Sequence, residues 1–243
     1  MISFYKKNGF LILRNVIKAK DIEKIYKRLK FHQKKDIKSA RSLSDPGTFN
    51  TLINFNKRDE IIGKIVQDSD WFKKTNNKLL NSKETVCWHA KANLKKSYKG
   101  SPEYFHQDNT YRKSLGFKKK MLNCMVFIDD HSHLNGGLWI FPGSHKREYK
   151  HERFLNINSL QKNFINRKQL NQINKKHKVL SINEKKGSCI FFHNLLVHGS
   201  SHNISPFNRA ILLYGITTKK NYEQANQKKI SNLNVSKRII FEA

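Results

Sequence analysis

Short apolar segments bounded by polar turn residues recur in the second half of the chain, which is the pattern of buried strands. The segments are residues 84–94, 121–129, 137–142, 188–194 and 209–216. Turn signals separate them, including Asn135-Gly136-Gly137 and Pro142-Gly143-Ser144. Short strands that follow a helical start predict an antiparallel barrel or sandwich braced by helices.

The first third of the chain has a different pattern. We expect a strand around residues 10–14 and then a helix beginning near Asp21, because apolar residues recur there at helical spacing. Residues 39–82 are polar and mixed, with a turn signal at 45–47 and a helix expected around 61–67.

Two polar segments lie outside the strand pattern. The insert from about 146 to 186 is rich in Lys and Asn, and we expect a loop with a helix around residues 160–173. The tail after residue 218 is polar and basic and ends in a candidate strand at 238–242. The length of 243 residues fits a single domain over 1–243.

Apolar runs are only a few residues long, so the sequence predicts neither a membrane span, which needs about 20 apolar residues, nor a signal peptide. Three cysteines, Cys87, Cys124 and Cys189, form no CxxC pair and no even framework. Unpaired cysteines are typical of a reducing compartment. We therefore expect a cytoplasmic protein.

The formal net charge of +30 raises the question of a polyanion partner. Lysines outnumber arginines by 38 to 10, whereas nucleic-acid recognition relies on arginine, and the 26 asparagines and 23 isoleucines point to a compositional bias. We expect a solvated lysine-rich surface and no specific nucleic acid, with a polyanion-binding module as the alternative. The charge also favours attraction of a small acidic substrate.

Known signatures of nucleotide hydrolysis, zinc proteolysis and serine hydrolysis are missing from the sequence. One pair stands out in the stretch PEYFHQDNTYRKS, where Asp108 follows His106 by two residues. On an extended strand two such side chains point to the same face, about 6.6 Å apart at Cα. Taken alone, the pair fits a chance His–Asp hydrogen bond as well as a metal site.

A second group of residues changes this interpretation. His198 ends an apolar run, Ser200 follows it, and Arg209 enters a strand that is otherwise apolar. A buried guanidinium is costly unless it meets an anion. The facial triad of two histidines and one carboxylate found in non-haem Fe(II) oxygenases accounts for His106, Asp108 and His198, with Arg209 as the anion-binding group.

The chain also resembles the phytanoyl-CoA dioxygenase family of Fe(II)/2-oxoglutarate oxygenases, which includes ectoine hydroxylase. The similar pieces are NGFLILRNV, FHQDNTY, NGGLWIFPGSHK and VHGSSHNISPFNRAIL, which together span about residues 4–217. The resemblance implies a double-stranded β-helix, a jelly-roll or cupin-like fold that is mainly β with flanking helices. It also implies Fe(II), 2-oxoglutarate, dioxygen and a small-molecule substrate.

Family roles can be carried over to matching positions. The resemblance implies that iron is bound by His106, Asp108 and His198. It assigns the distal carboxylate of 2-oxoglutarate to Arg209 and Ser200, with Asn93 as a looser match to a further cosubstrate contact. An intact carboxylate at position 108 favours hydroxylation of an aliphatic C–H over halogenation, while desaturation and C–X cleavage stay open.

Candidate substrate contacts come from the neighbourhood of the ligands. Asn109 and Tyr111 lie just past the first two ligands, Arg112 adds an anion contact, and Trp139 lies on a predicted strand. Among the other histidines we expect His145 to fix the Pro-Gly-Ser turn by hydrogen bonding. His89 and His193 fit either the cavity wall or core packing.

Overall fold

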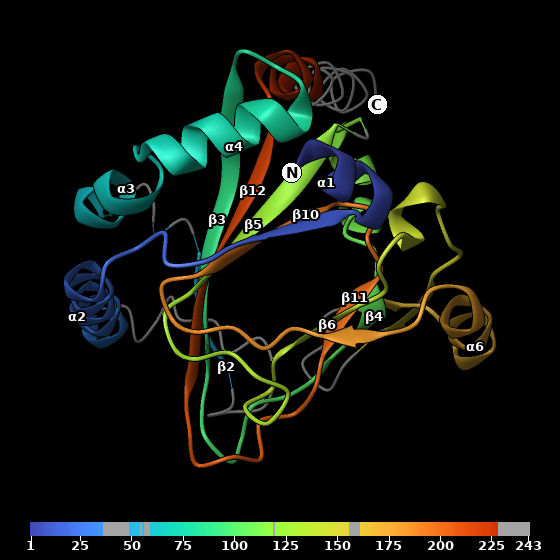
Figure 1. Cartoon of the computed structure of the whole chain (residues 1–243). Coiled ribbons are helices and arrows are strands. Elements are labelled where there is room, and N and C mark those ends of the chain that lie inside the picture. The colour runs from blue at the N-terminus through green and yellow to red at the C-terminus, as the bar shows by residue number, and fades with distance from the viewer. Residues whose placement is uncertain (36–48, 54, 56–58, 119, 156–160, 228–243) are drawn as a thin grey trace, which may run out of the picture.

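The computed structural model describes residues 1–35, 49–53, 55, 59–118, 120–155 and 161–227 (Figure 1). The helices are α1 (Ile2–Asn8), α2 (Ala19–Lys35), α3 (Glu60–Val66), α4 (Asp70–Leu80), α5 (Asn109–Arg112) and α6 (Arg167–Lys176). The strands are β1 (Phe10–Leu13), β2 (Phe49–Ile53), β3 (Thr85–Lys95), β4 (Glu103–His106), β5 (Met121–Phe127), β6 (Leu138–Ile140), β7 (Glu152–Leu155), β8 (Gln161–Phe164), β9 (Leu180–Ser181), β10 (Cys189–His193), β11 (His198–Ser200) and β12 (Arg209–Thr218).

Two antiparallel sheets form the centre of the fold. The larger has the order β1-β10-β5-β12-β3-β2, and the smaller has the order β4-β11-β6-β9. Apolar side chains from both sheets meet between them, with Phe127 and Phe192 from the larger sheet against Leu138 and Ile140 from the smaller. The prediction of a mainly β protein with flanking helices is confirmed.

The N-terminal helices cover the outer face of the larger sheet (Figure 1). Side chains along each strand alternate between this helix layer and the space between the sheets. In β12, Leu212 and Tyr214 pack under the helices, while Ile211 joins the core between the sheets. Arg209 is two residues from Ile211 on β12, so its side chain faces the same side, toward the space between the sheets.

The structure confirms the predicted strands and the helices at Asp21 and at residues 61–67, within a few residues at each end. It adds α4, which the sequence did not reveal. The buried face of α4 includes Thr75 and Asn76 beside Phe72 and Leu80, and these polar residues interrupt the apolar periodicity on which helix prediction rests.

The expectation for the insert was partly wrong. Its helix is α6, which begins at Arg167 and not near residue 160, and an antiparallel hairpin of β7 and β8 precedes it. The N-cap explains the late start, because the Asn166 side chain accepts a hydrogen bond from the backbone N–H of Gln169 at 2.9 Å. Residues 219–227 of the tail are helical, and the turn at 45–47 and the strand at 238–242 lie outside the described residues.

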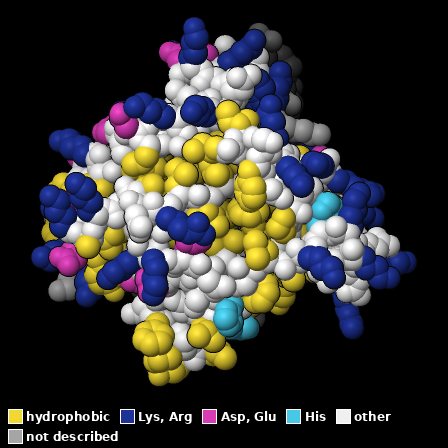
Figure 2. Space-filling model, viewed as in Figure 1, with side chains coloured by type: hydrophobic (Ala, Val, Ile, Leu, Met, Phe, Trp, Pro, Cys, Tyr) yellow, Lys and Arg dark blue, Asp and Glu magenta, His cyan; other side chains and the backbone are white. Residues whose placement is uncertain are grey.

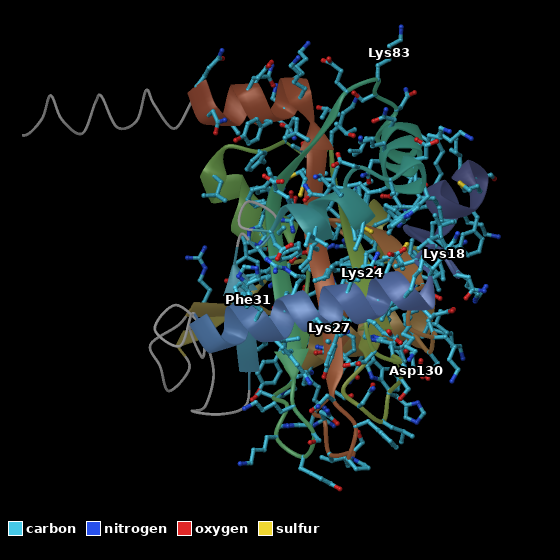
Figure 3. All side chains as sticks on the ribbon, turned by 90° about the vertical axis from the view of Figure 1, so that its left-hand side faces the viewer. Lys18, Lys24, Lys27, Phe31, Lys83 and Asp130 are labelled. Atoms are coloured by element: carbon cyan, nitrogen blue, oxygen red, sulfur yellow. The ribbon has the colours of Figure 1, made fainter. Side chains whose placement is uncertain are left out.

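The basic side chains do not gather into one field on the visible face. Lys and Arg lie around the rim of a central apolar area, with acidic residues among them (Figure 2). On α2, Lys24 and Lys27 lie along the outer face (Figure 3), and Lys24 is paired with Asp21 at 3.3 Å. Among the described residues, no helix is both long and apolar enough to cross a membrane.

Asp59 joins two helices of the outer layer. Its buried carboxylate is hydrogen-bonded to Arg28 Nε at 2.6 Å and His32 Nε2 at 2.7 Å, and it caps α3 by accepting from the Ile62 N–H at 3.1 Å. Burial raises the pKa of Asp59, but these three hydrogen bonds outweigh it and leave the pKa below its ordinary value. The carboxylate therefore stabilises the fold above about pH 4, and this stabilisation is lost as the pH falls through the lowered pKa.

Replacing this carboxylate should weaken the helix layer. We expect Asp59→Ala to lower the free energy of unfolding by about 2–3 kcal/mol at neutral pH, because it removes a helix cap and a charged hydrogen bond. Urea unfolding measures the difference from the wild type, which should shrink as the pH is lowered toward about 3. The matched control is Asp68→Ala, since Asp68 forms an exposed pair with Lys73. Equal losses in both variants at neutral pH would contradict the assignment.

Candidate metal centre

Two histidines from neighbouring strands of the smaller sheet lie side by side. His106 ends β4 and His198 begins β11, and they are opposite each other in the antiparallel register, with ring centroids 4.4 Å apart. Asp108 reaches both, with Oδ1 3.5 Å from His106 Nε2 and Oδ2 3.9 Å from His198 Nε2. One ligand atom from each residue lies within 4.8 Å of the others, so a single ion can be held by all three.

The position of Asp108 differs from the sequence expectation. His106 and Asp108 do not share a strand, because β4 ends at His106 and Asp108 has helical backbone angles (φ −61°, ψ −25°) at the N-cap of α5. The carboxylate therefore reaches the metal position from a strand-to-helix turn. The side chains of His106 and Asp108 still converge, as predicted, but the turn into α5 brings them together and not a shared strand.

The histidine hydrogen bonds leave the correct nitrogens for a metal. His106 Nδ1 lies 2.7 Å from the Tyr104 carbonyl oxygen, and His198 Nδ1 lies 2.9 Å from that of Leu196. A carbonyl oxygen accepts only, so each Nδ1 carries the proton and each Nε2 presents a lone pair toward Asp108. Two neutral imidazoles and one carboxylate are the donor set that non-haem Fe(II) takes, and the residues therefore fit the ion.

The electrostatics agree with this ligand set for Asp108 and His198. Burial, followed by the neighbouring His106, lowers the pKa of His198 to about 4. Burial also opposes the charge on Asp108, but Arg112 and the two histidines outweigh it and hold the pKa of this carboxyl well below its usual range. For His106, burial lowers the pKa and the Asp108 carboxylate raises it, with a net increase. Asp108 is thus ionised at neutral pH and His198 is neutral.

A layer of hydrogen bonds behind the ligands orients Asp108. Arg112 Nη2 donates to Asp108 Oδ2 at 3.2 Å and to Asn123 Oδ1 at 2.7 Å, and Asn123 Nδ2 donates to the same Asp108 oxygen at 2.7 Å. Such partners fix the rotamer of a ligating carboxylate. The sequence did not identify Asn123, because it lies in an otherwise apolar strand. Its role becomes clear only in the folded structure, where β5 directs its side chain toward Asp108.

The three ligand residues open onto a cavity of about 350 Å³ between the sheets. This volume is at the small end of the range for ligand sites. The cavity wall also includes the three predicted cosubstrate residues Asn93, Ser200 and Arg209. Residues that are about one hundred positions apart in the sequence thus line one space.

Arg209 supplies a cation to this cavity. It is 3% exposed, and its Nε has no hydrogen-bond partner among the described residues. Burial lowers the pKa of Arg209 to about 10 although Glu103 and Asp129 oppose the shift, so the guanidinium stays charged at neutral pH. A buried charged donor without a partner calls for an anionic ligand.

A second buried basic side chain, Lys95, was missed in the sequence. It is 1% exposed and is the cross-strand neighbour of Arg209. Its Nζ donates to Ser200 Oγ at 3.1 Å and to the carbonyl oxygens of Ser201 at 2.7 Å and Gly136 at 3.2 Å. Burial and the Arg209 charge lower the pKa of Lys95 to about 6. Lys95 is two residues from Asn93 on β3, so both side chains face the same side of the sheet. This spacing was the available sequence signal, but it is hard to recognise in a chain with 38 lysines.

The four candidate substrate residues divide into two pairs. Tyr111 and Arg112 line the cavity, and the Tyr111 hydroxyl accepts a hydrogen bond from the Asn163 N–H of β8 at 2.9 Å. Asn109 and Trp139 do not belong to the cavity wall. Asn109 is buried in a side-chain network with Asn194 and Glu148 because it lies inside the first turn of α5.

Trp139 and His145 lie away from the main cavity, whereas His89 is part of its wall. Trp139 lies between Leu138 and Ile140 on β6, and because these two side chains face the core, Trp139 faces the outer side of the smaller sheet. There it lines a separate groove with Tyr104 and Phe141. His89 lines the main cavity. His145 Nε2 is hydrogen-bonded to the Lys6 carbonyl oxygen at 3.2 Å and so joins the turn to α1.

Comparison with known proteins identifies a family and several similar proteins. Residues 5–211 match the model of the phytanoyl-CoA dioxygenase family (PhyH). An ectoine dioxygenase of Bordetella bronchiseptica is 24% identical over 222 residues, which cover 86% of this chain and 71% of the relative. An ectoine dioxygenase of Stutzerimonas stutzeri is 22% identical over 242 residues, which cover 93% of this chain and 78% of the relative.

Solved structures share the fold. EctD from S. alaskensis, crystallised with 2-oxoglutarate and 5-hydroxyectoine, superposes with a TM-score of 0.76 at 20% identity, covering 90% of this chain and 76% of that one. SnoK, a non-haem alpha-ketoglutarate dependent carbocyclase from nogalamycin biosynthesis, gives a TM-score of 0.71 at 14% identity, covering 89% and 82%. The predicted double-stranded β-helix is confirmed. The chain belongs to the phytanoyl-CoA dioxygenase family and is an Fe(II)- and 2-oxoglutarate-dependent dioxygenase.

Proposed function

We propose that this dioxygenase hydroxylates an aliphatic C–H bond of a small metabolite. The observation that carries the proposal is the ligand set, because His106, His198 and an intact Asp108 converge on a small cavity that also contains Arg209. Ectoine dioxygenases among the relatives support an oxygenation reaction. Desaturation and C–X cleavage stay open as alternatives, since the structural neighbours include a carbocyclase and an epimerase.

The residues have distinct roles in this proposal. His106, Asp108 and His198 hold the iron, while Arg209 and Ser200 bind the distal carboxylate of 2-oxoglutarate, with Asn93 beside them. Bound iron and 2-oxoglutarate supply the oxidising chemistry, in which 2-oxoglutarate becomes succinate and carbon dioxide and dioxygen provides the oxygen for the substrate. The protein orients these groups and holds the reacting C–H in the cavity beside them.

Ser200 depends on Lys95 for its orientation. The pKa of about 6 describes the cavity without its anion, and a bound dianionic cosubstrate favours the protonated form of Lys95. The ammonium donates hydrogen bonds and accepts none, so Ser200 Oγ then accepts from Lys95 Nζ at 3.1 Å. The serine proton is then left to donate to a carboxylate in the cavity. Lys95 thus supports the anion site both by its charge and by fixing the polarity of Ser200.

Removal of this lysine should weaken cosubstrate binding. We expect Lys95→Met to raise the 2-oxoglutarate concentration needed for half-maximal turnover about 10- to 100-fold, the effect of losing charged hydrogen bonds. The matched control is Lys96→Met, because Lys96 is the exposed neighbour on the same segment. An unchanged requirement in a folded Lys95→Met protein would rule out this role.

A metal-free barrel that binds polyanions was the alternative from another class. The converged ligand set and the family membership argue against it, and acidic side chains lie among the basic ones on the face in Figure 2. We expect no specific nucleic-acid partner. A cytoplasmic location remains a prediction, which the three free cysteines support.

A metabolite screen tests the proposed reaction. Iron-loaded protein with 2-oxoglutarate and dioxygen should release succinate when a substrate is present, and mass spectrometry should find a product that has gained one oxygen atom from labelled dioxygen. A product that has instead lost two hydrogen atoms would replace hydroxylation by desaturation. Succinate release equal in the wild type and in His198→Ala would contradict the enzymatic assignment.

A further inference from the structure

Arg112 has an unused donor in the cavity wall. The residue is 6% exposed and lines the cavity, and Trp88 lies 5.2 Å from its guanidinium carbon. Its Nη2 is occupied by Asp108 and Asn123, whereas the buried Nη1 has no hydrogen-bond partner among the described residues. A guanidinium only donates, so Nη1 requires an acceptor that the surrounding protein does not provide.

The charge of Arg112 is also incompletely balanced in the loaded enzyme. The carboxylate that it contacts is Asp108, an iron ligand, whose negative charge is shared with the doubly charged ion once iron is bound. A buried arginine beside a cation is costly unless another anion approaches it. The residue therefore has both an electrostatic and a hydrogen-bonding need for a negatively charged group.

The cavity as a whole favours the same group. Its wall carries three cations, Lys91, Arg112 and Arg209, against two carboxylates, Asp108 and Glu103. Iron and 2-oxoglutarate carry opposite double charges and cancel, which leaves one positive charge in the wall. His89 adds no charge to this balance, because burial, followed by the Lys91 and Arg112 charges, lowers its pKa to about 4.

Trp88 adds a second observation from the same wall. Its indole Nε1 is buried without an acceptor among the described residues. Gly215 on β12 makes room for the ring, since a Cβ at this glycine would lie 2.9 Å from Nε1. The aromatic face supports the guanidinium from one side, and the indole N–H is a further donor for an oxygen acceptor.

We propose that the primary substrate carries an oxyanion, a carboxylate or a phosphonate, that accepts a hydrogen bond from Arg112 Nη1 beside the iron. The inference rests on the proposed function and narrows its substrate class to small anions. Arg112 then has two tasks, since Nη2 orients Asp108 while Nη1 selects the substrate.

Matched pairs of small compounds test the inference. The probes are short aliphatic carboxylic acids, each paired with its methyl ester, and phosphonic acids, each paired with its neutral dimethyl ester. They are added without oxygen to protein loaded with Fe(II) and 2-oxoglutarate. The readout is the change in the visible metal-to-ligand charge-transfer band, followed by succinate release in air. We expect acids to perturb the band at concentrations about 10- to 100-fold lower than their esters. The carboxylate and phosphonate series show which oxyanion is preferred.

Variants separate substrate selection from metal binding. Arg112→Gln removes a hydrogen bond to Asp108 and should weaken iron binding, as Asn123→Ala does, but at saturating iron it should also lose the preference for acids over esters. Lys113→Gln, which removes an exposed cation paired with Glu148, should keep both the charge-transfer band and the preference. Trp88→Phe retains the ring and should reduce the preference in part. Asn123→Ala should weaken iron binding but keep the preference, because it removes a hydrogen bond to Asp108 and leaves Nη1 in place.

Two results would overturn the inference. One is a wild-type protein in which no acid acts better than its ester, and the other is an Arg112→Gln protein with an undiminished preference. A wild-type protein that forms no charge-transfer band would instead refute the proposed function, so the two failures are distinguishable.

Discussion

The His106→Ala, Asp108→Ala double variant is expected to purify without stoichiometric iron and to release no succinate above background. Two of the three converging ligand atoms are removed, and the remaining His198 cannot hold the ion alone. Loss of an outer partner of a metal ligand typically costs about 10- to 100-fold in affinity or activity. Loss of two direct ligands should exceed that range, which metal analysis and succinate assays measure.

The matched control uses a histidine outside the centre. His202 follows His198 by four residues and is exposed, so His202→Ala should retain iron and activity. The assignment is contradicted if the double variant binds iron as well as His202→Ala does. Far-ultraviolet circular dichroism of both variants establishes that any loss arises at the site and not from unfolding.

Arg209→Ala should raise the requirement for 2-oxoglutarate more than any other single change in the anion site. The guanidinium is 3% exposed and lacks a partner for Nε among the described residues, so the bound carboxylate would lose a buried charge partner. Such losses cost about 2–5 kcal/mol, which corresponds to roughly 30- to 4,000-fold in the 2-oxoglutarate concentration for half-maximal turnover. The maximal rate at saturating 2-oxoglutarate should fall less.

Two other arginine variants make this measurement specific. Arg209→Lys keeps the positive charge but not the planar pair of donors, and its effect should lie between the wild type and Arg209→Ala. Arg14→Ala removes an exposed guanidinium paired with Glu184 and should leave the requirement unchanged. Equal 2-oxoglutarate dependence in Arg209→Ala and Arg14→Ala would refute the clamp.

The sequence predicted those parts of the site that depend on strand alternation and on residue type. Arg209 was identifiable because a charged residue in an apolar strand needs an anion, and its inward parity with Ile211 agrees. His106 and Asp108 became informative only together with His198, because a His–Asp pair alone is common. The converging ligand atoms now support that joint interpretation.

Other parts depend on tertiary contacts that no local pattern carries. Lys95 looks like one of many surface lysines until β3 pairs with β12 and brings it beside Arg209. Asn109 follows the metal ligand by one residue, yet the turn into α5 directs its amide toward Asn194 and away from the cavity. The helix α4 was hidden because its buried face includes polar residues.

The most direct test of the central claim is the visible charge-transfer band that Fe(II) and 2-oxoglutarate produce together without oxygen. The wild-type protein should develop the band on addition of both components, and the His106→Ala, Asp108→Ala variant should not. Absence of the band in the wild type, or a band of equal strength in the variant, would contradict an iron centre built from His106, Asp108 and His198.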